Sequence, residues 1–134
     1  MSTAGCLPAN GTKKSFIAAN GSTIVKGVGV YESAAGEVSV ATANLKCIGV
    51  AMESVVGTGT NRVEVILADG GTYRCKASGT VTRNEFLIAG TDGFENQTIG
   101  GGTTVKYFIG QALESGVDDD FVEVKLGSFG AGCA

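Results

Sequence analysis

Few side chains in this 134-residue chain could perform chemistry, and the sequence contains no histidine. Histidine is the commonest general base, the commonest metal ligand and the usual partner of a serine or cysteine nucleophile. One lysine, Lys46, stands directly beside a cysteine, Cys47. Neighbours along an extended strand point to opposite faces, so this pair would not act together. The sequence therefore predicts a protein that is not an enzyme and needs no cofactor.

Carboxylates gather at Asp118-Asp119-Asp120, with Glu114 upstream, and could in principle bind a hard cation. The run falls in a predicted turn, where successive side chains diverge. A solvated acidic loop that discourages aggregation is the favoured interpretation, so we predict no metal site. A soluble module that binds a glycan or a metal stays an alternative. The segment Gly57-Thr58-Gly59-Thr60 resembles half of a phosphate loop, but it lacks the Lys-Ser/Thr pair that opens a helix.

Four cysteines stand at positions 6, 47, 75 and 133, and none forms a C-x-x-C pair. This spacing disfavours a zinc site. Cys47 and Cys75 lie in apolar, strand-like runs, which predicts that they are small buried hydrophobic residues. Cys6 and Cys133 lie near the two ends of the sequence, and a disulfide between them stays open.

The charge balance also restricts the partners. Ten Lys and Arg residues stand against thirteen Asp and Glu residues, a net charge of −3, without the clustered positive charge that the phosphate backbone requires. No apolar targeting segment occurs in residues 1–20, and the longest apolar run is far too short to span a membrane. We therefore expect no nucleic-acid partner, no membrane partner, and synthesis in a reducing cytoplasm.

Two segments of the chain repeat each other. Residues 48–54, IGVAMES, return as residues 109–115, IGQALES, with identity at five of seven positions. Residues 63–67, VEVIL, return as residues 122–126, VEVKL, with identity at four of five. The offsets are 109 − 48 = 61 and 122 − 63 = 59, so the intervening turns differ by two residues. The repeat therefore predicts two copies of one structural unit, over roughly residues 27–67 and 84–126.

The pattern inside each copy is that of short strands. Apolar runs are bounded by glycine, of which the chain has 22, and residues 63–67 alternate in the period-two pattern of a half-buried strand. Asp69-Gly70-Gly71 predicts a tight hairpin turn, with residues 72–76 as the return strand. Two copies are too few for a solenoid, so each must close its apolar face against its sister. The prediction is an all-β fold, a small β-barrel or sandwich of two pseudo-symmetric copies, in a single domain over residues 21–134.

One difference between the copies suggests an interface. If the alternating valines of residues 63–67 face the core, Ile66 faces outward, and its counterpart in the second copy is Lys125. Val50 likewise corresponds to Gln111. An apolar residue where the sister copy keeps a polar one predicts a covered surface, so we assign Val50 and Ile66 to a subunit interface. Isolated exposed aliphatic residues are the alternative.

Residues 1–20 are rich in Ser, Thr, Gly, Asn and Ala, which predicts an extended N-terminal arm. A frayed terminus is the alternative interpretation. The arm nevertheless carries charge and apolar bulk with which it could bind another protein surface. We predict that it attaches the protein to its partner through five residues: Leu7, Lys13, Lys14, Phe16 and Ile17.

The repeated segments resemble a signature of the capsid decoration proteins of tailed phages, also called cement or head-stabilising proteins. In the first copy, Ala35-Gly36-Glu37-Val38 precedes residues 48–53, IGVAME; in the second, Asp92-Gly93-Phe94 precedes residues 109–114, IGQALE. The resemblance covers roughly residues 25–126. The long N-terminal arm and the glycine-rich segment 127–133 depart from the pattern.

This resemblance implies a non-enzymatic virion protein on the outer surface of an icosahedral capsid. Its partner would be the major capsid protein, whose lattice it stabilises, and it would associate with itself as a homotrimer. Many copies acting together would make individually weak contacts effectively permanent. The alternative within the same class is a subunit or base of a head fibre or tail appendage.

Overall fold

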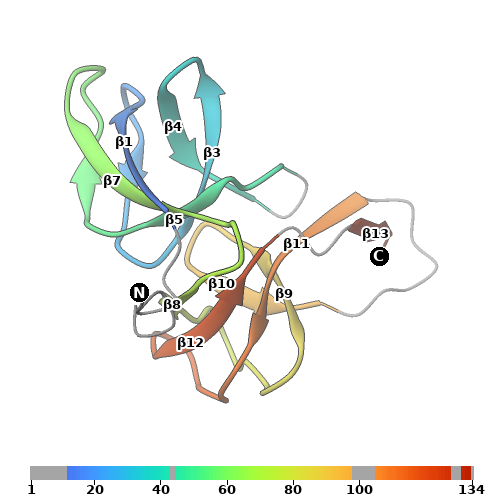
Figure 1. Cartoon of the computed structure of the whole chain (residues 1–134). Helices are drawn as coiled ribbons and strands as arrows, with labels where there is room; N and C mark the ends of the chain where they lie inside the picture. The colour runs from blue at the N-terminus through green and yellow to red at the C-terminus, as the bar shows by residue number, and fades with distance from the viewer. Residues whose placement is uncertain (1–11, 43–44, 98–104, 128–130, 134) are drawn as a thin grey trace, which may run out of the picture.

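The computed structural model describes residues 12–42, 45–97, 105–127 and 131–133, and these residues form strands joined by turns and bends, with no helix among them. The predicted all-β class, with a closed β-barrel, is confirmed. Figure 1 shows two β bodies, one above the other. We call them unit 1 (residues 13–67) and unit 2 (residues 72–126).

Unit 1 is a closed barrel with the strand order β1-β4-β3-β5-β7, and the short strands β2 and β6 pair with each other beside it. In this barrel β1 runs antiparallel to β7 and parallel to β4, so the first strand of the unit closes it. The strands of unit 1 are β1 Lys13–Ala18, β2 Thr23–Ile24, β3 Gly29–Ala34, β4 Glu37–Val40, β5 Gly49–Ala51, β6 Val55–Val56 and β7 Arg62–Leu67.

Unit 2 repeats the order as the sheet β10-β9-β11-β12-β8, and a parallel bridge from Ala77 to Phe94 joins its two edges. The first half of β11 extends beyond the unit and pairs with β13, which gives the ribbon at the right of Figure 1. The strands are β8 Thr72–Lys76, β9 Phe86–Ala89, β10 Phe94–Asn96, β11 Val105–Ala112, β12 Phe121–Leu126 and β13 Ala131–Cys133.

The strand pairings of the two units agree residue by residue. Lys13 pairs with Ile66 in unit 1, and residues 59 positions later, Thr72 and Lys125, pair in unit 2. The pairing of residues 49–51 with β7 likewise returns in residues 110–112 with β12. The structural repeat is therefore longer than the sequence repeat, because it begins with β1 and β8.

The predicted boundary of the N-terminal arm at residue 20 is wrong for residues 13–18, which form β1. Phe16 is 4% exposed and Ala18 is fully buried in the core of unit 1. The backbone of β1 pairs with β7 over five residues. β1 and its counterpart, KKSFIA and TYRCKA, share only the final alanine, which is why the sequence repeat did not reveal this strand.

The predicted hairpin at Asp69-Gly70-Gly71 is also wrong. The strand β8 pairs with β12 of unit 2, whereas β7 pairs with β1 and β5 of unit 1. Gly70 has φ +106°, which only glycine adopts at low cost, but the turn links two units and does not close a hairpin. Its backbone N–H donates to the Leu126 carbonyl at 3.0 Å, which fixes the linker to unit 2.

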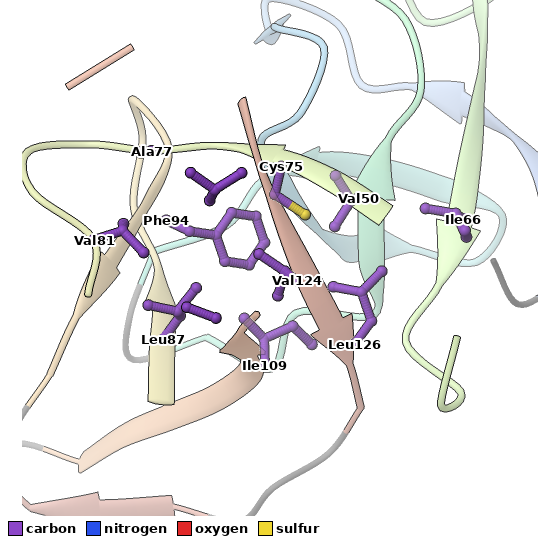
Figure 2. Packing of buried hydrophobic residues seen from close by; sticks show 12 residues of the cluster. Val50, Ile66, Cys75, Ala77, Val81, Leu87, Phe94, Ile109, Val124 and Leu126 are labelled. Carbon is purple, nitrogen blue, oxygen red and sulfur yellow. The ribbon is translucent and has the colours of Figure 1, made fainter. Parts of the chain in front are cut away.

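Each unit has its own apolar core at equivalent positions. The core of unit 1 consists of buried side chains on the inner faces of its strands and loops: Phe16, Ala18, Ile24, Val30, Val38, Ala51, Val63 and Val65. The core of unit 2 is built in the same way: Cys75, Ala77, Val81, Leu87, Phe94, Ile109, Ala112, Val122, Val124 and Leu126. The second cluster has two further members, Val50 and Ile66, which come from unit 1. Figure 2 shows the Val50 side chain extending toward Cys75 and Leu126.

The repeated glycine of IGVAMES and IGQALES permits close approach of two strands. A Cβ on Gly49 would overlap the Ile66 carbonyl oxygen, and a Cβ on Gly110 would overlap the Val124 side chain. A larger residue at Gly49 would therefore force β7 outward, and one at Gly110 would displace the Val124 side chain. This steric requirement explains why both copies keep glycine at this point.

Candidate interaction surfaces

The most repeated motif in the sequence makes hydrogen bonds that hold the fold together. Glu53 accepts a hydrogen bond from the backbone N–H of Glu64 at 3.0 Å, and Glu114 accepts one from that of Glu123 at 3.0 Å. The serine that follows acts in the same way in both copies, because Ser54 and Ser115 accept the N–H of Lys26 and Arg83, each at 3.0 Å. The sequence showed that the motif was repeated, but these bonds join residues too distant in the chain to predict.

The five residues predicted to attach the protein do not share one environment. Leu7 lies outside the described residues. Lys13 and Lys14 are exposed on β1, and the Lys14 ammonium lies 5.2 Å from the centre of the Phe16 ring. Phe16 belongs to the core, and Ile17 is partly buried with its N–H bound to the Gly36 carbonyl at 2.9 Å. Of the four described residues, only the two lysines present their side chains to solvent.

The assignment of Val50 and Ile66 to a subunit interface is wrong. Both are 0% exposed within the single chain, because they pack into the core of unit 2. Ile66 faces away from the core of unit 1 and is covered, as predicted, but the cover is the second half of the same chain. Their counterparts on unit 2 remain polar, with Gln111 partly exposed and Lys125 exposed.

The junction between the units is dry and closely packed. The carbonyl of Gly27 in unit 1 accepts the N–H of Lys76 in unit 2 at 3.0 Å. A Cβ placed on Gly29 would lie 3.0 Å from the Ala89 Cβ and 3.5 Å from the Phe94 ring, so glycine is required for this contact. This junction therefore belongs to the fold and is not a surface available to a partner.

The acidic residues 118–120 support their own turn. Asp118 accepts the N–H of Gly79 at 2.8 Å, and Asp120 accepts the N–H of Val117 at 2.9 Å. Asp119 lies 3.4 Å from the Lys76 ammonium. Within the described residues no group of acidic or cysteine side chains could hold a metal ion.

Cys47 and Cys75, the two cysteines whose side chains the structure describes, are free thiols at the junction of the units. Burial raises the pKa of the Cys47 thiol from 9.0 to about 12, and backbone hydrogen bonding at Gly49 and Val30 opposes this only in part. The Cys47 thiol donates to the Gly49 carbonyl at 3.1 Å. Burial also raises the pKa of Cys75, with a smaller contribution from Cys47. Both thiols are therefore held in the unreactive protonated form at neutral pH. The predicted bridge from Cys6 to Cys133 involves side chains outside those that the structure describes.

Two exposed valines occupy equivalent positions in the two units. Val56 in β6 is 64% exposed and Val117 is 60% exposed, and the offset of 61 residues makes them counterparts. The sequence indicates that these valines are counterparts, because the same offset relates IGVAMES to IGQALES, but it does not show that they are exposed. These valines are candidate contact points for a larger assembly.

Comparison with known proteins gives a similarity of fold but not of sequence. The sequence matches no protein-family model and no curated protein. The fold is similar to the solved structure of the head fibre gp8.5 N base of bacteriophage phi29, with a TM-score of 0.63 and 17% sequence identity. The match covers 87% of this chain and 95% of that chain. At this identity the similarity concerns the fold, which both chains share over almost their full length.

The described residues contain no helix with the length and apolar character needed to cross a lipid bilayer.

Proposed function

We propose that this chain is a non-enzymatic structural protein of a tailed-phage virion, carried on the outer face of the capsid. The observation that supports this most is the fold similarity to the phi29 head fibre base, which extends over 87% of the chain. The side chains of the repeated motif support the same conclusion, since Glu53, Ser54 and their counterparts bind backbone N–H groups within the fold.

Two arrangements on the capsid fit this proposal. The chain could be the base of a head fibre, as favoured by the solved structure that it resembles. It could instead be a decoration protein that stabilises the major capsid protein lattice, as favoured by the resemblance of residues 35–53 and 92–114 to that family. The decoration arrangement implies a homotrimer, and neither arrangement requires a catalytic group.

We further propose that attachment uses the exposed lysines of β1 together with the segment before it. Lys13 and Lys14 are exposed at the start of β1, and residues 1–11, including Leu7, precede them in the sequence. Positive side chains at this point would suit an acidic patch on the major capsid protein. Removal of residues 1–18 would destroy β1, so a useful deletion ends at residue 11.

Electron cryomicroscopy of the virions tests the main proposal. A decoration protein would occupy all equivalent positions of the capsid lattice, whereas a fibre base would occupy few positions, each with a projecting fibre. Absence of the chain from purified virions, established by mass spectrometry, would refute both arrangements. The mass of the purified protein by light scattering tests the trimer.

Co-sedimentation with capsids that lack the protein tests the attachment surface. We expect the Lys13→Glu/Lys14→Glu variant and the deletion of residues 2–11 each to weaken binding. Lys26→Glu/Lys46→Glu, a charge reversal at two other exposed lysines of unit 1, is the matched control and should bind as the parent does. Equal loss in the control would mean that net charge, and not this surface, governs binding.

A further inference from the structure

The junction between the units joins two parts of the chain that a short linker, residues 68–71, connects. Val50 and Ile66 of unit 1 are fully buried in the core cluster of unit 2. The Gly27 carbonyl of unit 1 accepts the N–H of Lys76 in unit 2 at 3.0 Å. These contacts depend on which two faces meet, and not on whether both faces belong to the same copy of the chain.

The two halves of the linker are held by different units. The Asp69 carboxylate accepts the N–H of Thr12, directly before β1, at 3.2 Å. Gly70 donates its N–H to the Leu126 carbonyl at 3.0 Å, and the Gly71 carbonyl accepts the Leu126 N–H at 2.8 Å. The linker therefore passes from unit 1 to unit 2 between residues 69 and 70. The direction of the backbone at this point determines whether the two units of one copy can meet.

Gly70 gives the linker its direction. Its φ is +106°, a conformation in which residues with a side chain are strained. A Cβ at Gly70 would meet no atom of the described residues within 4 Å. Crowding therefore does not exclude a side chain here, and only the backbone conformation does. A β-branched residue would favour an extended linker, which would carry unit 2 away from unit 1 of the same copy.

An extended linker would leave both sides of the junction open. Unit 1 would expose Val50 and Ile66, and unit 2 would lose two members of its core cluster. A second copy in the same state carries the matching faces, so unit 1 of each copy could cover unit 2 of the other. This exchange closes both junctions in a symmetric dimer, the arrangement called domain swapping. In the parent chain the short linker favours closure within one copy, because it keeps the two faces at a high effective concentration.

We infer that the bend at Gly70 keeps the junction within one chain, and that the same junction joins two copies when the bend is lost. The partner is a second copy of this chain, and the surfaces are the two faces that already form the junction. The claim concerns the isolated chain and does not rest on the proposed virion function.

Refolding from urea over a series of protein concentrations, followed by sedimentation velocity, tests this inference. Gly70→Val should yield a species of twice the parent's mass, in a fraction that rises with the concentration during refolding. Gly70→Ala is less strained, should yield a smaller fraction, and decides the question if Gly70→Val does not fold. Gly70→Asn should refold largely as the parent does, because asparagine tolerates positive φ better than other residues with a side chain.

A matched control separates the linker from strain in general. Gly36, between β3 and β4, has φ +75°, and a Cβ there would also meet no described atom within 4 Å. Gly36→Val should therefore be strained without acting on the linker, and it should sediment as the parent does.

Dilution of the isolated dimer distinguishes exchange from association of intact surfaces. An exchanged dimer should persist on dilution, because its dissociation requires both junctions to open. The inference is overturned if the folded Gly70 variants, shown by cooperative melting, keep the parent's mass at every concentration. It is also overturned if the dimer dissociates as soon as it is diluted, or if Gly36→Val or Gly70→Asn forms as much dimer as Gly70→Val.

Discussion

The two units share one pairing scheme, but they close it differently. In unit 1 the N–H groups of Ile17 and Ala19 donate to Gly36 and Val38 of the same unit, each at 2.9 Å. Unit 2 keeps the counterpart of the Ala19 bond, in which the N–H of Ser78 donates to the Phe94 carbonyl at 2.8 Å.

The counterpart of the Ile17 bond does not stay within unit 2 but joins unit 2 to unit 1. The N–H of Lys76, the counterpart of Ile17, donates to Gly27 of unit 1. The core differs in the same way, because unit 2 takes in Val50 and Ile66 from unit 1. Unit 1 closes its own seam but needs unit 2 to cover Val50 and Ile66, whereas unit 2 takes part of its seam and part of its core from unit 1.

Substitutions at Ile66 and at its counterpart Lys125 should show the largest difference in the free energy of unfolding. Ile66→Lys would place an ammonium in the dry junction, and we expect it to lower the free energy of unfolding by at least about 3 kcal/mol. The reverse change in unit 2, Lys125→Ile, is the control and should alter stability by no more than about 0.5 kcal/mol. Urea denaturation of both variants at low protein concentration measures this difference. Equal effects would mean that the two faces are not in different environments.

Substitutions at Gly49 and at its counterpart Gly110 should show a smaller difference in the free energy of unfolding. Gly49→Ala brings a methyl group against the backbone carbonyl of Ile66, which cannot move without displacing β7, and should cost about 3 kcal/mol. Gly110→Ala meets mainly the Val124 side chain, which can shift, and should cost about 1–2 kcal/mol. Thermal unfolding of the two variants gives the order. A larger loss for Gly110→Ala would contradict the packing described for β5.

Substitutions at Glu53 and at its counterpart Glu114 should show the smallest difference in the free energy of unfolding. Glu53→Ala and Glu114→Ala each remove one acceptor of a backbone N–H bond, and each should cost about 1 kcal/mol. Glu114 also lies 3.0 Å from the Arg74 guanidinium, but both groups are largely exposed, so this ion pair should add only about 0.2–0.5 kcal/mol. Denaturation in low and high salt separates the two contributions, because only Glu114→Ala should lose part of its effect at high salt. A salt-dependent loss in Glu53→Ala would contradict this assignment.

The sequence was sufficient to predict the all-β class and the positions of several strands, but it left a barrel and a sandwich as alternatives, and the structure shows the barrel. Periodicity in residues 63–67 also showed that Ile66 lies on the face opposite Val63 and Val65. Periodicity describes the two faces of a strand, however, and does not identify what covers each one. The cover over Ile66 therefore had to come from the structure.

The wrong predictions for residues 69–71 and residues 1–20 have a common physical cause, because both depend on contacts between residues far apart in the sequence. Glycine and aspartate at residues 69–71 indicate a turn, but a turn between two units and a turn within a hairpin make the same local demands. The polar composition of residues 1–20 conceals β1, because Lys13, Lys14 and Ser15 face solvent and only Phe16 and Ala18 provide core contacts. Closure of the barrel by β1 depends on partners about 20 and 50 residues away, which local pattern does not reveal.

Amide hydrogen exchange of the Ile66→Lys variant, resolved by peptide, tests most directly whether unit 2 depends on unit 1. We predict that β8 and β12 lose protection, since their core loses an apolar member, while β1, β3 and β4 of unit 1 keep theirs. Equal loss of protection in both units, or loss confined to unit 1, would contradict the asymmetry on which this account depends.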